Sequence, residues 1–247
     1  GVLFGACIDN HQNVYHRYIE KIEDIRLFRG SKYVQSDLKD TFKQAKLFLE
    51  KGRMVCFSGT PCQIAGLKKY LNRDYNNLIT VDVVCRGVPS PLVLKKYLEY
   101  QKKKLNSKEI KEIIFRDKSI YGYDYSVLTV KTDNKTYHNG IDTDPYLRAF
   151  FSNMSIRQSC YNCHFRTVDR VSDFTIWDCY ISEKFDKTFD DNKGTTRVLL
   201  HTKKALEIFK QIQEKYKFKE IQVKELVADS KEINIGIEWN KNRTQFF

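Results

Sequence analysis

Two neighbouring segments of the chain share one order, a short apolar run, a tight turn and an amphipathic helix. This repeated order limits the fold more than any other feature. In residues 53–71, RMVCFS has the length of a strand, GTP is a turn, and CQIAGLKKYL has apolar residues at helical spacing. Residues 78–104 repeat the order with LITVDVVC, RGVPSP and LVLKKYLEYQKKK. Such alternation with short turns predicts a parallel sheet with right-handed crossover helices.

The remaining segments complete an α/β chain. We predict a hairpin over residues 1–19, a helix over 38–50, and an excursion rich in β-strands around residues 109–140. Toward the C-terminus, the patterns predict helices over 144–153 and 203–216 and strands over 173–180, 196–202 and 218–223. The predicted fold class is therefore α/β, with a mainly parallel sheet, crossover helices and a β-rich excursion.

A cysteine stands at the turn of each repeat. Thr60 is a suitable N-cap, Pro61 suits the first helical position, and Gln63 completes a capping-box pattern, so Cys62 is predicted in the first turn of a helix. Cys85 ends the next predicted strand. Both cysteines are then expected at the carboxyl edge of the sheet, where open α/β sheets bind ligands. A helix N-terminus also favours the thiolate, which is the form of cysteine that binds metals.

Seven cysteines form an odd number in a chain without an export signal, so metal or redox chemistry explains them better than disulfides. The C-x2-C pair Cys160 and Cys163 can reach one metal centre, and with Cys62 and Cys85 it supplies four thiolates. This number suits a 4Fe-4S cluster and a structural zinc ion equally, and the spacing leaves both open. The other three cysteines lie within strand patterns and are interpreted as packing residues, with Cys179 the best substitute ligand among Cys7, Cys56 and Cys179.

Three further interpretations of these patterns carry less weight. The run CYNCH matches covalent haem attachment, which needs an exported chain, and a dithiol redox pair would sit in a different structural setting. The formal net charge of +12 raises the possibility of a nucleic-acid partner. The lysine runs fall on amphipathic helices without interleaved aromatic residues, so we interpret them as a solvated surface and predict no nucleic-acid binding.

No run of eighteen apolar residues occurs, so we predict no membrane span and a cytoplasmic location.

Residues 29–36, RGSKYVQS, combine basic side chains, hydroxyl groups and a glycine ahead of a predicted helix. Such a segment suits a phosphate or pyrophosphate group. An ordinary surface turn has a similar composition, and the residues alone leave both interpretations open.

Five motifs, in this order, resemble the beta-subunit family of the coenzyme F420 hydrogenases and dehydrogenases over nearly the whole chain: GSKYVQS, FSGTPCQIAGL, VDVVCRGVPSP, CYNCHF and SDFTIWDCY. Members of this family are flavin and iron-sulfur oxidoreductases that pass electrons between a cluster, FAD and a partner such as a deazaflavin. The chain departs from the family at Arg86, where a histidine is common.

The resemblance implies a 4Fe-4S cluster held by Cys62, Cys85, Cys160 and Cys163, close to FAD. It also implies that RGSKYVQS and SGTP, with the glutamine that follows, line the flavin site. The implied flavin residues are Arg29, Gly30, Ser31, Lys32, Tyr33, Gln35, Ser36, Ser58, Gly59, Thr60, Pro61 and Gln63.

The resemblance further implies that residues 1–247 form a single cofactor-binding domain, without the upstream ferredoxin-like domain and glycine-rich flavin segment that family members carry. A redox partner protein or ferredoxin-like domain would then dock near the cluster. Two other functions fit the residues: a zinc-stabilised binding module with a basic surface, and a fragment that holds no cofactor.

Overall fold

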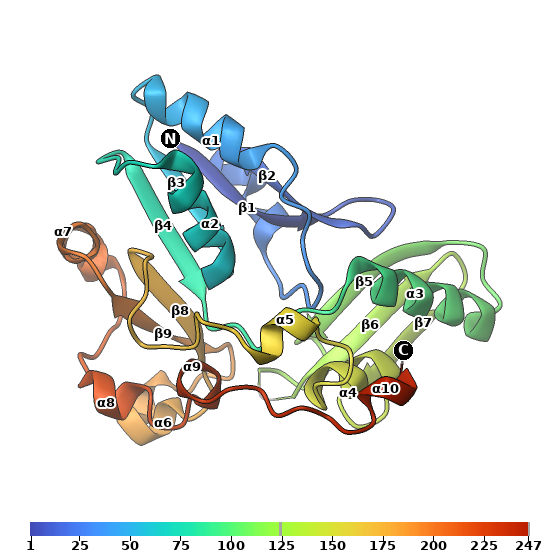
Figure 1. The fold of residues 1–247 in the computed structure, drawn as a ribbon. Helices are drawn as coiled ribbons and strands as arrows, with labels where there is room; N and C mark the ends of the chain where they lie inside the picture. The colour runs from blue at the N-terminus through green and yellow to red at the C-terminus, as the bar shows by residue number, and fades with distance from the viewer. Residues whose placement is uncertain (124, 247) are drawn as a thin grey trace.

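Two β-sheets organise the chain, which a computed structural model describes over residues 1–123 and 125–246 (Figure 1). The larger sheet has the strand order β2-β1-β3-β4-β8-β9. Its strands are β1 (Val2–Ile8), β2 (Val14–Ile19), β3 (Val55–Gly59), β4 (Leu78–Val83), β8 (Phe174–Cys179) and β9 (Thr195–Leu200). Strands β1, β3, β4 and β8 are mutually parallel, and β2 and β9 pair antiparallel at the two edges.

The smaller sheet is the β-rich excursion, and it is antiparallel throughout. It consists of β5 (Ile110–Asp117), β6 (Val127–Thr132) and β7 (Thr136–Gly140) in that order. The predicted fold class, a mainly parallel α/β sheet with a β-rich excursion, is confirmed.

The longer helices cover the two sheets. Helices α1 (Thr41–Glu50) and α2 (Pro61–Leu71) pack on β1, β3 and β4, where Phe4, Phe57 and Leu67 are fully buried. Helices α3 (Pro91–Leu105) and α4 (Pro145–Phe151) pack on the smaller sheet. Helix α7 (Lys203–Ile212) follows the edge strand β9. The short elements are η1 (Ile22–Phe28), α5 (Gln158–Tyr161), α6 (Ser182–Phe185), η2 (Lys187–Phe189), η3 (Gln213–Lys215), α8 (Val223–Leu226), α9 (Lys231–Asn234) and α10 (Arg243–Phe246).

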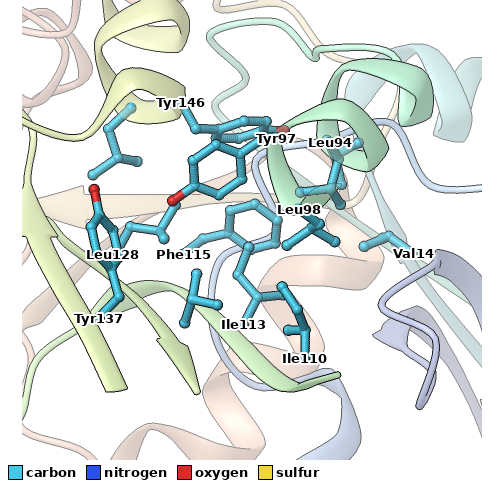
Figure 2. Close-up of a cluster of buried hydrophobic side chains, with 13 residues drawn as sticks. Val14, Leu94, Tyr97, Leu98, Ile110, Ile113, Phe115, Leu128, Tyr137 and Tyr146 are labelled. Atoms are coloured by element: carbon cyan, nitrogen blue, oxygen red, sulfur yellow. The ribbon is translucent and has the colours of Figure 1, made fainter. Parts of the chain in front are cut away.

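The core of the smaller sheet also anchors the larger one. Figure 2 shows Phe115, from β5, surrounded by side chains of α3, β6 and α4. Val14 from β2 enters the same cluster, so the edge of the larger sheet shares a hydrophobic core with the excursion. This shared core sets the position of the excursion beside the carboxyl edge of the parallel strands.

Three sequence predictions need correction. The predicted strand over residues 218–223 is wrong: the chain is irregular there until α8, and Phe218 packs edge-on against Phe209 of α7. A short segment forms a strand only where a neighbouring strand satisfies its backbone groups, and Phe218 lies against a helix instead. The helix predicted over 203–216 ends at Ile212 and gives way to the η3 turn. The helix predicted from residue 38 begins at Thr41, because Lys39 adopts a φ of +47°, which is incompatible with an α-helix.

The C-terminal segment returns to the middle of the chain. In Figure 1 it runs from α9 past α5 and ends beside α4. The Trp239 and Tyr161 rings lie 4.6 Å apart, and the Asn240 side-chain amide donates to the Ser152 carbonyl oxygen at 2.7 Å. None of the described helices combines the length and apolarity that crossing a membrane requires.

We predict that Phe115→Ala lowers the free energy of unfolding by about 3–5 kcal/mol, because the Phe115 side chain is only 1% exposed and its removal leaves a cavity. Urea denaturation followed by circular dichroism measures this change. The control Phe218→Ala removes the same side chain at a position that is 49% exposed, and should cost less than about 1 kcal/mol. Equal losses in the two variants would contradict the assigned core.

Candidate functional site

The turn between β3 and α2 presents Cys62 at the carboxyl edge of the parallel strands. Thr60 is the N-cap of α2 and Pro61 its first residue, as predicted. The Thr60 backbone N–H donates to Gln63 Oε1 at 2.9 Å, which is the Gln63 half of the predicted capping box. A Cβ atom at Gly59 would lie only 3.0 Å from Gln63 Oε1, so the turn favours glycine there. Cys62 itself is exposed.

Cys85 lies two residues beyond the end of β4, in the neighbouring turn. Gly87 adopts a φ of +120°, and its N–H donates to Cys85 Sγ at 3.4 Å. A Cβ atom at Gly87 would lie 3.3 Å from Cys160 Cβ, so this glycine lets the C-x2-C segment approach the turn closely. Burial raises the pKa of the Cys85 thiol to about 12.

The four cysteines of the predicted cluster site lie near one another. Cys160 is in α5 and Cys163 follows it in a turn. Burial raises the pKa of Cys160, and the nearby Cys163 and Cys62 raise it further. Cys160 and Cys62 likewise raise the pKa of Cys85. The chain therefore brings together four thiols from three separate segments.

The four thiols suit two kinds of metal centre. A structural zinc ion and a four-iron cluster can each take four cysteine thiolates. Across residues 1–123 and 125–246, no group of three or more His, Cys, Asp or Glu side chains is placed to share one metal ion. The number and donor type of the four thiols fit both centres equally.

A half-buried cation, Arg166, lies beside these thiols. Burial lowers the pKa of Arg166, and the neighbouring Cys85, Cys163 and Cys160 raise it. Arg166 donates to the carbonyl oxygens of Cys85, at 3.3 Å, and Arg86, at 2.8 Å. Its position holds the turn after β4 against the C-x2-C segment and supplies positive charge where thiolates would be negative.

Arg86 ties the same turn to two other parts of the chain. Its guanidinium forms an ion pair with Glu232 of α9 at 2.9 Å and donates to the Phe151 carbonyl oxygen at 2.7 Å. Arg86, which stands where the resembled family commonly has a histidine, therefore anchors the C-terminal segment to the turn after β4.

The two predicted flavin segments meet through a residue that the sequence analysis did not select. His16 of β2 is 2% exposed, and its Nε2 lies 3.1 Å from the Ser58 carbonyl oxygen, to which it must donate. His16 Nδ1 then accepts from Ser36 Oγ at 2.9 Å, and Ser36 Oγ accepts from Gln63 Nε2 at 3.0 Å. The chain of hydrogen bonds runs from residues 29–36 to the N-terminus of α2. A lone histidine in an alternating strand gives no sequence signal for this role.

The other implied flavin residues occupy the loop after η1. Gly30 has a φ of +80°, which explains the glycine. Lys32 Nζ donates to the carbonyl oxygens of Phe28 and Arg29, at 3.0 and 2.9 Å, and burial lowers its pKa to about 8. The Tyr33 ring stacks on Phe150 at 4.7 Å, and its hydroxyl neighbours Ser31.

One cavity involves only one of the twelve implied flavin residues. A cavity of about 630 Å³ lies between the β1–β2 turn and α3, and Gln35 lines it. The other eleven, all within the described ranges, do not line that cavity. The structure therefore brings together the Ser36 and Gln63 ends of the two segments, and places Gln35 on a separate cavity wall.

The three cysteines interpreted as packing residues lie in strands. Cys7 and Cys179 are buried, at 2% and 3% exposure. Burial raises the pKa of Cys56 in β3 to about 11. The Cys179 thiol forms a hydrogen bond with Arg197. This contact gives the thiol a polar partner within the protein, so no metal is needed to explain the cysteine.

The structure is that of an α/β protein that gathers four thiols at one edge of its sheet. The sequence profile that describes the C-terminal part of the beta subunit of coenzyme F420 hydrogenase/dehydrogenase matches residues 52–225, which is well over half of the chain. The chain belongs to this family, and family membership places it among the oxidoreductases.

A solved structure supports the fold. A chain of the F420-reducing NiFe hydrogenase complex from Methanosarcina barkeri, determined after xenon derivatization, is similar with a TM-score of 0.54 and 19% sequence identity. The match covers 87% of the present chain and 67% of the hydrogenase chain. No curated protein matches the sequence.

We predict that the stability of the protein falls as the pH drops from about 6.5 toward 4. Burial, with a smaller contribution from Lys32, lowers the pKa of His16 from 6.5 to about 4, so between these values the unfolded state binds a proton that the folded state does not. The loss from this group is about 3 kcal/mol at pH 4. Urea denaturation at pH 7 and pH 4 measures it. His16→Gln, which cannot titrate, should lose about 3 kcal/mol less over the same interval; equal losses would contradict the assignment.

Proposed function

We propose that this chain is an iron-sulfur flavoprotein that passes electrons between a 4Fe-4S cluster, FAD and an external donor or acceptor. The observation that carries the proposal is the gathering of four thiols, from the β3–α2 turn, the turn after β4 and the α5 segment, beside the half-buried Arg166. Family membership agrees with a redox role. When bound, a 4Fe-4S cluster supplies single electrons and FAD converts them to two-electron chemistry.

Cys62, Cys85, Cys160 and Cys163 are the proposed cluster ligands. Burial disfavours the negative charge of a thiolate, so forming each buried thiolate costs free energy. The positive charge of iron offsets that cost on binding. Arg166 adds positive charge beside three of the four thiols. Arg166 therefore both holds the turn after β4 in place and reduces the repulsion among four negatively charged ligands.

For FAD, the proposed site is formed by residues 29–36 and the β3–α2 turn. The hydrogen bonds from Ser58 through His16 and Ser36 to Gln63 hold the two segments together before any ligand arrives. Lys32 and the N-terminus of α2 supply positive charge suited to a diphosphate. The protein's part would be to bind and orient the flavin close to the cluster.

We propose that residues 1–247 act as one cofactor-binding domain, and that a redox partner protein or ferredoxin-like domain docks where Cys62 is exposed. The similar hydrogenase chain comes from a complex, which agrees with a protein partner. All seven cysteines, each within the described residues, are unpaired, which is typical of a reducing compartment, so we propose a cytoplasmic location.

We expect anaerobic reconstitution to give about four iron and four sulfide per chain and a broad visible absorption band. Cys62→Ala should abolish the band, because one ligand of the cluster is lost. The control Cys7→Ala, which removes a buried thiol in β1, should keep it. Stoichiometric zinc in place of iron would instead support the zinc-stabilised binding module, and a sample without any metal would support the cofactor-free fragment.

We predict that FAD binding depends on Ser36. Ser36→Ala should weaken FAD binding about tenfold, because the Ser36 hydroxyl joins His16 and Gln63 and its loss leaves buried polar groups unpaired. Quenching of flavin fluorescence on titration measures the dissociation constant. The control Ser107→Ala, at an exposed hydroxyl in the loop before β5, should leave it unchanged. If wild-type protein binds no FAD, the flavin half of the proposal fails.

A further inference from the structure

The hydroxyl of Thr60 contacts a cysteine sulfur. Thr60 Oγ1 lies 3.1 Å from Cys62 Sγ, within hydrogen-bonding distance. Thr60 is the N-cap of α2, and an N-cap hydroxyl ordinarily accepts from a backbone N–H of the first turn. Here the hydroxyl has a second partner in the side chain of the proposed metal ligand.

The direction of this hydrogen bond follows from the chemistry of the sulfur. A neutral thiol can donate or accept, but a metal-bound thiolate carries no proton and can only accept. With iron bound at Cys62, the Thr60 hydroxyl must therefore be the donor. Hydrogen bonds to the sulfurs are among the factors that set the potential of an iron-sulfur cluster, because they stabilise its more negative, reduced form.

Neighbouring residues hold Thr60 in place. Its backbone N–H donates to Gln63 Oε1 at 2.9 Å, and Gln63 Nε2 donates to Ser36 Oγ at 3.0 Å. Ser36 is bonded in turn to the buried His16. The hydroxyl is thus attached to a backbone position that a chain of hydrogen-bonded side chains fixes, rather than to a mobile surface loop.

We propose that Thr60 donates a hydrogen bond to the Cys62 thiolate and thereby raises the reduction potential of the cluster. This inference rests on the proposed function, because it requires a cluster bound at Cys62. It assigns to Thr60 a role toward the cluster, separate from the flavin contact that the resemblance implies.

The test compares the cluster potential of Thr60→Val and Thr60→Ser with that of the wild type. Thr60→Val keeps the shape of the side chain and removes the donor, whereas Thr60→Ser keeps the hydroxyl. Each full-length protein is reconstituted anaerobically and titrated with redox mediators, and the reduced cluster is followed by electron paramagnetic resonance. We expect Thr60→Val to reduce the equilibrium constant for cluster reduction about threefold, which is roughly half of the 59 mV that corresponds to tenfold for one electron. Thr60→Ser should restore the wild-type potential.

A second threonine provides a matched control. Thr202 is the N-cap of α7, and its hydroxyl accepts from the Ala205 N–H at 3.1 Å and donates to Asp173. Thr202→Val removes an N-cap hydroxyl in the same way and should leave the potential unchanged. A shift in this control equal to that of Thr60→Val would attribute the effect to helix capping and overturn the inference.

The remaining outcomes separate the inference from the proposed function. A wild-type protein that takes up no cluster overturns both. A loaded cluster with the same potential in Thr60→Val and wild type overturns only the role of Thr60. If Thr60→Val loads no cluster while Thr60→Ser does, the hydroxyl is needed for assembly rather than for the potential, and the inference is likewise overturned.

Discussion

The parallel pairing of β3 with β4 determines where every candidate site residue lies. The register joins Val55 to Leu78 and Gly59 to Asp82, so both strands end at one edge of the sheet. Each strand is followed at once by a turn and a helix, α2 or α3. Cys62 and Cys85 are therefore held at neighbouring positions, although 22 residues separate them in the printed sequence. An antiparallel pairing would have placed the two turns at opposite ends of the strands.

The second requirement of the site is electrostatic. Burial and the proximity of other thiols raise the pKa of Cys85 and Cys160, so these two thiols resist ionisation. A metal binds the thiolate form, so binding at these two residues would release protons. Arg166 is positioned to compensate part of the thiolate charge, since it contacts the backbone of Cys85 and neighbours three of the four sulfurs.

The hydrogen bonds around His16 give the adjoining part of the site a single arrangement. Only one tautomer, with the proton on Nε2, lets His16 donate to the Ser58 carbonyl and accept from Ser36. Ser36 then has its acceptor position free for the Gln63 amide. Because each group has one donor role and one acceptor role, the β3–α2 turn and the loop of residues 29–36 are held in one relative position. A rigid frame of this type suits a site that must orient a cofactor.

The sequence by itself determined the local structure of the site and its chemical type. Turn residues and helical spacing placed the start of α2 at Thr60 and Pro61, and the C-x2-C pair indicated two nearby thiols, because these signals act over only a few residues. The tertiary structure alone decided which distant residues join them. His16 reaches Ser58 and Arg166 reaches Cys85 through strand pairing and packing between segments far apart in the chain, which no local pattern encodes. The same physical reason explains the wrong strand prediction at residues 218–223, because Phe218 packs against Phe209 of α7 and the segment joins neither sheet of the described residues.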